Sequence, residues 1–233
     1  MQWGFTLREF APNAMLDQPA VQAFIAQATK RSHPAKKVII HAGDEPQSLY
    51  FLLEGSMSVS VQDEDNREMV LAYLNPGEFF GEMCLFPEQK TRTAEVRTRT
   101  QVLVAEIGFE AFRRFIREQP EIMLTLAGQL ASRLRATTQR LTDLAFLDVQ
   151  GRVAHEILNL CRQPDAQPHA RGTLVRISRQ ELARIVGCSR EMAGRVLKKL
   201  SADGTVSVQG RSVVVLGVQF TGVVKPPPLK QRH

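Results

Sequence analysis

The sequence predicts an α+β protein in which the strands come first and most of the helices follow. Short segments of alternating apolar and polar residues occupy positions 37–107, and glycines interrupt them at intervals typical of a closed antiparallel structure. Helical periodicity then takes over, and one run without proline is far longer than an ordinary globular helix. A second helical region ends in two further alternating segments. These observations predict a β-roll of the jelly-roll type, a long helix, and a C-terminal domain that combines helices with a hairpin.

The β-roll is expected to span residues 20–118, after an N-terminal extension at 1–19. Apolar residues from Met57 to Val61 alternate with serines, as in a strand that buries one face. The polar cluster at 63–66 predicts the turn that ends this strand. A strand-rich domain of this length is long enough to bury its own core.

Two helices follow the strands. Residues 109–118 are expected to form a short helix, and residues 119–148 a long one that has Pro120 in its first turn and continues to about Val149. Five positions of the long helix are spaced alternately by four and three residues, which is the a and d pattern of a coiled coil. They are Leu130, Leu134, Thr137, Leu141 and Leu144. We expect this seam to join two copies in a parallel homodimer; packing of the same stripe against the chain's own β-roll is the alternative.

Residues 149–217 are expected to form the C-terminal domain. It begins with a helix over about 149–161 and a polar loop at 163–172. Its last segments alternate in hydrophobicity around residues 209–210, which predicts a hairpin. Residues 218–233 are too rich in proline and charge to fold alone, so we expect a flexible tail there.

Between the loop and the hairpin, two short helices are predicted with a tight turn between them. Ser178 is a natural N-cap of the first helix, and Glu181 completes a capping box. Gly187 supplies the conformational freedom that the turn needs, and Ser189 caps the second helix. A helix pair followed by a hairpin is the pattern of a winged helix-turn-helix, which reads double-stranded DNA.

The charge distribution supports a nucleic-acid partner for this domain. Residues 1–149 hold 16 Lys and Arg against 19 Asp and Glu, a balance of −3, whereas residues 150–233 hold 14 against 5, a balance of +9. Positive charge that is concentrated in one domain indicates a phosphate backbone as partner. A merely well-solvated surface is the alternative explanation of the charge alone.

The second helix of the pair carries the predicted base-reading residues. Arginine can donate twice to guanine and glutamate can accept from cytosine, so Arg190, Glu191 and Arg195 are expected to read G·C pairs. Phosphate contacts that set the register are expected from Arg179, Ser189 and Lys198. A surface ion pair between Glu191 and Arg195, four residues apart, is the alternative for those two.

Several function classes find no support in the sequence. No paired acid and base, no nucleophile with a base and no phosphate-cradling glycine loop indicates an enzyme. The three cysteines are far apart and form no CxxC pair, so neither a disulfide framework nor a metal site is expected. There is no run of 18 apolar residues and no signal-peptide pattern, so we expect a cytoplasmic protein without a membrane partner.

Three blocks of sequence together resemble the CRP/FNR family of bacterial transcription factors. They are PGEFFGEMCLF with TRTAEV, RATTQRLTDLAFLDV, and ISRQELARIVGCSREMAGRVLKKL. The resemblance covers residues from about 20 to 217. It implies a cyclic-nucleotide-binding β-roll, a dimerisation helix and a winged helix-turn-helix that binds inverted TGTGA-like half-sites. It also implies that the loop at 163–172 contacts RNA polymerase, although an ordinary linker remains the alternative for that loop.

The same resemblance places an effector pocket in the roll. A cyclic phosphodiester needs a guanidinium, hydroxyl or N–H donors and one acidic acceptor. By resemblance, Glu82 accepts from the ribose 2′-hydroxyl, Arg92 pairs with the phosphate, and Thr93 and the backbone from Gly81 to Met83 donate to it. Two threonines of the long helix, Thr137 and Thr138, are expected to meet the base. Without the resemblance, a surface ion pair between Glu82 and Arg92 is the alternative.

The identity of the effector stays open at this point. Family members that respond to cAMP usually have serine where this chain has Thr93, while the strings GEM and VRTRT resemble a branch that responds to cyclic di-GMP. We expect a cyclic nucleotide effector, with cAMP favoured and cyclic di-GMP second. The competing hypothesis is an effector-independent DNA-binding protein that uses the roll as a dimer scaffold. A nucleotide-hydrolysing enzyme is a third hypothesis.

Overall fold

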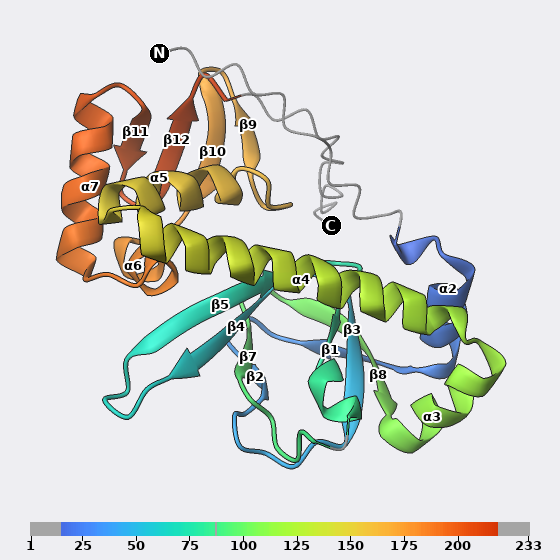
Figure 1. The fold of residues 1–233 in the computed structure, drawn as a ribbon. Helices are drawn as coiled ribbons and strands as arrows, with labels where there is room; N and C mark the ends of the chain where they lie inside the picture. The colour runs from blue at the N-terminus through green and yellow to red at the C-terminus, as the bar shows by residue number, and fades with distance from the viewer. Residues whose placement is uncertain (1–14, 87, 219–233) are drawn as a thin grey trace. The chain divides into compact units, whose positions relative to one another are not determined.

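The computed structural model describes residues 15–86 and 88–218 of the chain. The chain divides into two compact units, with the boundary between Asp148 and Val149 (Figure 1). The first unit contains the strands β1 to β8 and the helices α2 to α4, and the second contains the helix pair and the remaining strands. Residues 1–14 of the predicted N-terminal extension and residues 219–233 of the predicted C-terminal tail lie outside the described residues.

The first unit is a roll of two four-stranded sheets in which every pairing is antiparallel. One sheet has the order β1-β8-β3-β6, with β1 at Thr29–His33, β8 at Val102–Gly108, β3 at Ser48–Glu54 and β6 at Phe79–Phe80. The other has the order β2-β7-β4-β5, with β2 at Val38–Ile40, β7 at Glu95–Thr98, β4 at Met57–Gln62 and β5 at Glu68–Leu74. The predicted α+β fold with an N-terminal β-roll is confirmed.

Phenylalanines fill the interior of the first unit where helices cover the β1-β8-β3-β6 sheet. The helix α2, Pro19–Gln27, contributes Phe24, whose ring lies edge-on to those of Phe51 and Phe79. The helix α3, Phe109–Glu118, matches its expected bounds and contributes Phe112 and Phe115. All five rings are buried. Because burial of each ring removes a large apolar area from water, this cluster fixes β6 and the helices against one another.

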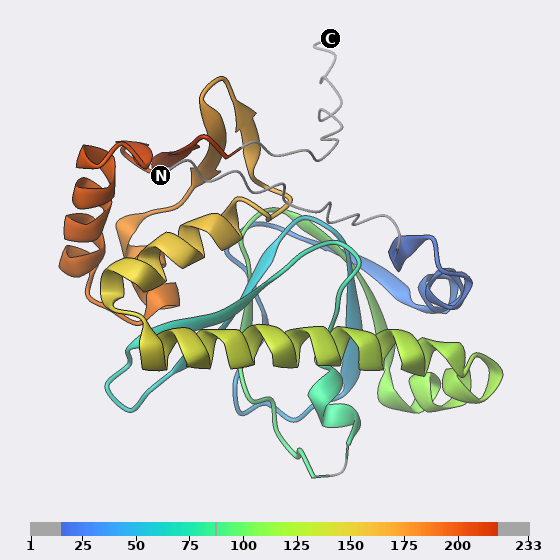
Figure 2. The same cartoon turned by 45° about the horizontal axis from the view of Figure 1, so that its top comes forward.

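The long helix α4 spans Glu121–Phe146, 26 residues, and runs along the roll in both views (Figures 1 and 2). It is shorter than expected: Pro120 is its N-cap rather than a first-turn residue, and it ends before Leu147 instead of near Val149. Leu147 has an extended backbone, φ −103° and ψ 140°, which separates α4 from the next helix. The sequence has no proline or glycine at 147–149, so it contained no signal that predicts this break.

Most of the predicted a and d seam of α4 is exposed in the single chain. Leu134, Leu141 and Leu144 are 69%, 67% and 45% exposed, and Leu130 is half-buried. Packing against the chain's own roll therefore does not account for the seam. Buried positions of α4 are instead Ile122, Leu126 and Gln129, nearer its N-terminus.

The second unit starts with the helix α5, Val149–Leu160, and contains the sheet β11-β12-β10-β9. Its strands are β9 at Gln167–His169, β10 at Gly172–Arg176, β11 at Val206–Gln209 and β12 at Ser212–Leu216. The strands β11 and β12 form the expected hairpin. The polar loop expected at 163–172 contains a short strand that was not predicted, because β9 pairs there with β10. All three residues of β9 are exposed, so no alternation in hydrophobicity could reveal the strand.

The helix pair forms as its capping residues predict. The helix α6 spans Arg179–Val186, and the Ser178 hydroxyl oxygen accepts from the backbone N–H of Glu181 at 3.1 Å. Gly187 has φ 71°, a left-handed conformation that most side chains disfavour. The helix α7 spans Arg190–Ala202, capped by Ser189, whose hydroxyl accepts from the Met192 N–H at 3.1 Å. The described second unit is therefore a helix-turn-helix followed by a wing.

Candidate functional site

The candidate pocket residues of the roll lie at the end of β6, where the chain makes a tight turn. Gly81 has φ 77° and ψ 10°, and a 3₁₀ helix, Glu82–Leu85, follows it directly. A Cβ atom at Gly81 would lie only 2.6 Å from Nη1 of Arg92. The sequence therefore needs glycine here for two reasons, the positive φ and the close approach of a guanidinium.

Arg92 is buried beside this turn and bonded to neutral acceptors. Its Nη1 donates to the carbonyl oxygen of Gly81 at 2.8 Å and its Nη2 to that of Ser48 at 2.7 Å. The guanidinium carbon lies 5.9 Å from the ring centre of Tyr50 and 5.7 Å from that of Phe109. Arg92 forms no ion pair with any residue that the structure describes. This arrangement keeps an uncompensated positive charge at a site that is 7% exposed.

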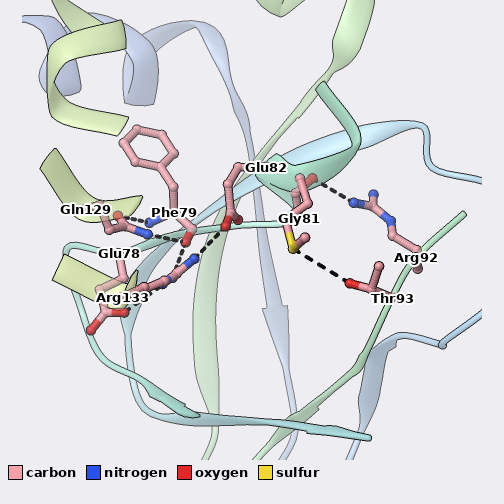
Figure 3. A network of polar contacts seen from close by, with 9 residues as sticks. Glu78, Phe79, Gly81, Glu82, Arg92, Thr93, Gln129 and Arg133 are labelled. Atoms are coloured by element: carbon pink, nitrogen blue, oxygen red, sulfur yellow. Dashed lines mark hydrogen bonds and ion pairs between the residues drawn. The ribbon is translucent and has the colours of Figure 1, made fainter. Parts of the chain in front are cut away.

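Glu82 points the other way, toward α4 (Figure 3). Its Oε1 accepts from Nη1 of Arg133 at 2.7 Å, and the residue is 5% exposed. Arg133 also donates through Nη2 to the carbonyl oxygen of Phe79 at 2.6 Å, and the same nitrogen lies 3.4 Å from Oε2 of Glu78. The alternative of an ion pair between Glu82 and Arg92 is thus not what forms, because each has other partners.

Burial affects the second carboxylate of this cluster. Desolvation raises the pKa of Glu78, and the positive charge of Arg133 opposes that rise. A guanidinium between two carboxylates is neutralised locally, which distinguishes Arg133 from Arg92.

The remaining residues expected in the pocket divide into two groups. Thr93 is beside the turn, with its hydroxyl 3.7 Å from the sulfur of Met83, which is half exposed (Figure 3). Thr137 and Thr138 are exposed on α4, and the Thr138 hydroxyl donates to the carbonyl oxygen of Leu134. Neither of these threonines is bonded to the turn residues within one chain.

The second candidate site is an open groove of about 960 Å³ along α7 in the second unit. All six residues expected to bind DNA line it: Arg179, Ser189, Arg190, Glu191, Arg195 and Lys198. Its other lining residues are Gly194, Leu197, Ser201 and Val208. The apolar stripe of α7, Ala193, Val196, Leu197 and Leu200, is buried, as its spacing predicts.

The charged side chains of the groove have no charged partners among the described residues. Arg190, Glu191 and Arg195 are exposed, and the alternative ion pair between Glu191 and Arg195 does not form there. Arg179 lies across α7 near Gly194, where an added Cβ would be 3.4 Å from its Cδ. A glycine at this position leaves room for the arginine at the rim of the groove.

Comparisons with known proteins identify the family of each unit. The family pattern described as "Cyclic nucleotide-binding domain" matches residues 30–119, and the "Crp-like helix-turn-helix domain" matches residues 151–219. The chain is 48% identical to the cAMP-activated global transcriptional regulator Vfr of Pseudomonas aeruginosa, over 84% of this chain and 92% of that protein. It is 43% identical to the cAMP-activated global transcriptional regulator CRP of Escherichia coli, over 86% and 96%. The chain belongs to the CRP/FNR family of transcription regulators.

Relatives of this CRP/FNR regulator differ in effector. The CRP-like protein Clp of Xanthomonas euvesicatoria is 42% identical, over 92% of this chain and 95% of that protein. The solved structure of the c-di-GMP-responsive global regulator CLP of Xanthomonas campestris has a TM-score of 0.80 at 43% identity, over 85% of this chain and 99% of that one. Cyclic-nucleotide control of transcription is therefore shown for relatives with two different effectors, and overall similarity does not separate them.

Two functional candidates on α4 of the CRP/FNR regulator were missed from the sequence. Gln129 and Arg133 are four residues apart on one face of the helix and both bind the backbone of Phe79. Polar residues repeated at helical spacing beside an apolar seam were a possible signal. The partner, however, lies about 50 residues away in sequence, and only the fold brings it near.

The described chain contains no group of three or more His, Cys, Asp and Glu side chains that could hold a metal ion. None of the helices in residues 15–86 and 88–218 is long and apolar enough to cross a membrane. Cys161 is buried, which raises the pKa of its thiol to about 12.

Proposed function

We propose that this protein is a homodimeric transcription regulator whose binding to operator DNA is controlled by a cyclic nucleotide, with cAMP as the favoured effector. The observation that carries this proposal is the buried, uncompensated charge of Arg92 next to the left-handed turn at Gly81. Its hydrogen bonds to carbonyl oxygens are weaker than those to an anion, so a phosphodiester can replace them. Two of the five N–H donors of the guanidinium are used, which leaves others for that anion.

Glu82 has a matching free acceptor. Only its Oε1 is bonded within the described part of the chain, so Oε2 can accept from a ribose 2′-hydroxyl while Arg133 stays in place. One uncompensated cation suits the single phosphodiester of cAMP. Cyclic di-GMP has two phosphodiesters and needs a second cation, but Arg133 is already paired with two carboxylates. This difference is why cAMP is favoured and cyclic di-GMP is second.

The dimer completes the proposed pocket. The exposed seam of α4 can bury its leucines against a second copy, and a parallel dimer places Thr137 and Thr138 where two chains meet. These threonines then contact the base of a nucleotide held by the turn. Binding of one ligand thereby biases the packing of the helix pair, which is the element shared by both chains.

The groove along α7 is proposed to read inverted TGTGA-like half-sites about one helical turn apart. Arg190, Glu191 and Arg195 contact base edges, and Arg179, Ser189 and Lys198 contact phosphates. The β9-β10 turn region at 163–172 is proposed to contact RNA polymerase. The protein acts in the cytoplasm and, like its relatives, as a regulator rather than an enzyme; incubation with cAMP followed by chromatography is expected to show no turnover.

The test is the affinity for a duplex with two inverted TGTGA half-sites, measured by fluorescence anisotropy without nucleotide, with cAMP and with cyclic di-GMP. We expect cAMP to change the dissociation constant by a factor within the roughly 5- to 150-fold typical of allosteric coupling. 5′-AMP, which lacks the cyclic phosphodiester, is the matched control and should have no effect. A response to cyclic di-GMP alone would overturn the choice of effector. No response to either nucleotide would favour the effector-independent alternative.

A further inference from the structure

The edge of the β1-β8-β3-β6 sheet requires partners that no strand of the described chain supplies. The last strand, β6, is only two residues long and pairs with β3 on one side, where Phe79 is opposite Phe51. Its other side has no neighbouring strand in residues 15–86 and 88–218. Buried backbone groups without partners are costly, so a short edge strand in the interior must be satisfied by side chains.

Gln129 of α4 supplies both partners at once. Its Oε1 accepts from the N–H of Phe79 at 2.8 Å, and its Nε2 donates to the carbonyl oxygen of Phe79 at 2.6 Å (Figure 3). Gln129 is 7% exposed, so these two bonds are shielded from water. A side-chain amide is suited to this task because it presents one acceptor and one donor in a plane, as an adjacent strand would.

One helical turn further on, Arg133 binds the same carbonyl oxygen and also Glu82. Phe79 is only two residues before Gly81 and three before Glu82. Two links therefore join α4 to the segment at 79–82. Gln129 binds Phe79 at the start of the segment, and Arg133 binds Glu82 at its end.

We propose that Gln129 is the positioning residue that couples the nucleotide site to α4; the proposal rests on the function proposed above. A nucleotide in the site adds a contact to Glu82 and thereby alters the strength of the bond between Glu82 and Arg133, which links the turn to α4. With Phe79 held by Gln129, β6 cannot slide along α4, so a displacement of the turn is passed to the helix. Without Gln129, β6 moves relative to α4 when the turn is displaced, so α4 stays where it is. The nucleotide then binds with little effect on the affinity for DNA.

A purely structural role predicts a different result. In that case, loss of Gln129 lowers thermal stability but leaves unchanged the factor by which nucleotide alters operator affinity. This coupling factor is a ratio of two dissociation constants for one variant, so a uniform loss of folded protein cancels from it.

The test uses the full chain with Gln129→Met, which keeps the length and flexibility of the side chain and removes both hydrogen bonds. Gln139→Met is the matched control, since Gln139 is exposed on the same helix and donates only to Asp143 at 2.9 Å. Cyclic AMP and cyclic di-GMP are the probes. Calorimetry gives their affinities, and anisotropy gives operator affinity with and without each.

We expect Gln129→Met to bind the effector nucleotide with an affinity within about threefold of wild type. Its coupling factor should fall to about one-fifth or less of the wild-type factor, which we expect to lie in the usual range of about 5- to 150-fold. Gln139→Met should keep the wild-type factor. A folded Gln129→Met with wild-type coupling overturns the proposal.

A second variant decides the matter if Gln129→Met does not fold. Gln129→Glu keeps the acceptor for the Phe79 N–H but not the donor, and it should also lower the coupling factor; a wild-type factor overturns the proposal. If wild-type protein shows no response to either nucleotide, the proposed function fails and this inference fails with it. A normal wild-type response with unaffected Gln129 variants overturns the inference alone.

Discussion

The two units use arginines in opposite ways. On α7, Arg190 and Arg195 are exposed and have no bonded partner in the part of the chain that the structure describes. In the first unit, Arg92 and Arg133 are buried or half-buried, and their hydrogen bonds are made within the protein, to carbonyl oxygens or carboxylates. Under the proposed function, DNA would meet arginines without internal partners on α7, whereas a nucleotide would have to replace existing contacts of Arg92.

This difference explains why one site can report on the other. A ligand that replaces the internal hydrogen bonds of Arg92 changes the contacts of the elements that accept them, here the turn at Gly81 and β3. A ligand that contacts only side chains without internal partners on a helix leaves the contacts within the protein almost unchanged. The roll is thus the part that can switch, and the helix-turn-helix is the part that reads.

The largest expected effect is from Arg92→Leu. Loss of a charged hydrogen bond costs about 1.5–3 kcal/mol, so removal of two or more from the phosphate should weaken nucleotide binding by at least roughly 100-fold. Calorimetry measures this loss, and weak non-specific DNA binding should persist. Arg97→Leu, at a half-exposed arginine paired with Glu95, is the control. If Arg92→Leu bound the nucleotide with wild-type affinity, the proposal that Arg92 binds its phosphate would be wrong.

The next effect concerns the seam of α4. Leu134→Glu places a charge where two chains are proposed to meet and removes about 1.5–3 kcal/mol of apolar burial per chain. Sedimentation should show that the dissociation constant of the dimer rises by about tenfold or more, which corresponds to a loss of about 1.4 kcal/mol or more. Leu124→Glu is the matched control, because Leu124 is 76% exposed on the same helix but outside the seam. Equal behaviour of the two variants would argue against the seam.

Arg190→Ala should cost roughly 1–3 kcal/mol on a half-site that contains guanine, and specificity at that base should relax. Lys198→Ala should instead weaken binding to all sequences alike and lower the slope of affinity against salt by about one. Anisotropy with operator and random duplexes separates the two. Equal losses of Arg190→Ala on both duplexes would contradict base reading.

The smallest expected effect concerns the stability of the C-terminal unit. Ser178→Ala removes an N-cap hydrogen bond and should lower the free energy of unfolding of the C-terminal unit by about 1 kcal/mol. Ser201→Ala, at an exposed helical serine without a capping role, should change it by less than about 0.5 kcal/mol. Denaturant titration followed in the second unit provides the measurement. A loss of similar size in both variants would show that the cap contributes nothing special.

Local signals were enough for the helix-turn-helix. The caps at Ser178 and Ser189 and the turn at Gly187 depend on residues three or four positions apart, so the sequence contains the whole of each interaction. The wing followed from alternation in hydrophobicity over a few residues.

Non-local contacts were less accessible. The bonds of Gln129 and Arg133 to Phe79 join positions about 50 residues apart, and polar spacing on α4 does not reveal which strand they meet. Similarly, β9 forms through backbone pairing of three exposed residues, and α4 ends at Phe146 without proline or glycine. The pocket was predicted as a set of residues, but its internal bonding required the fold.

Reciprocal linkage tests the central claim most directly. Cyclic AMP is titrated by calorimetry into the protein alone and into the protein saturated with operator duplex. If the roll controls the reading helices, DNA must change the affinity for cAMP by the same factor by which cAMP changes the affinity for DNA, roughly 5- to 150-fold. An affinity for cAMP that is the same with and without operator would contradict the account.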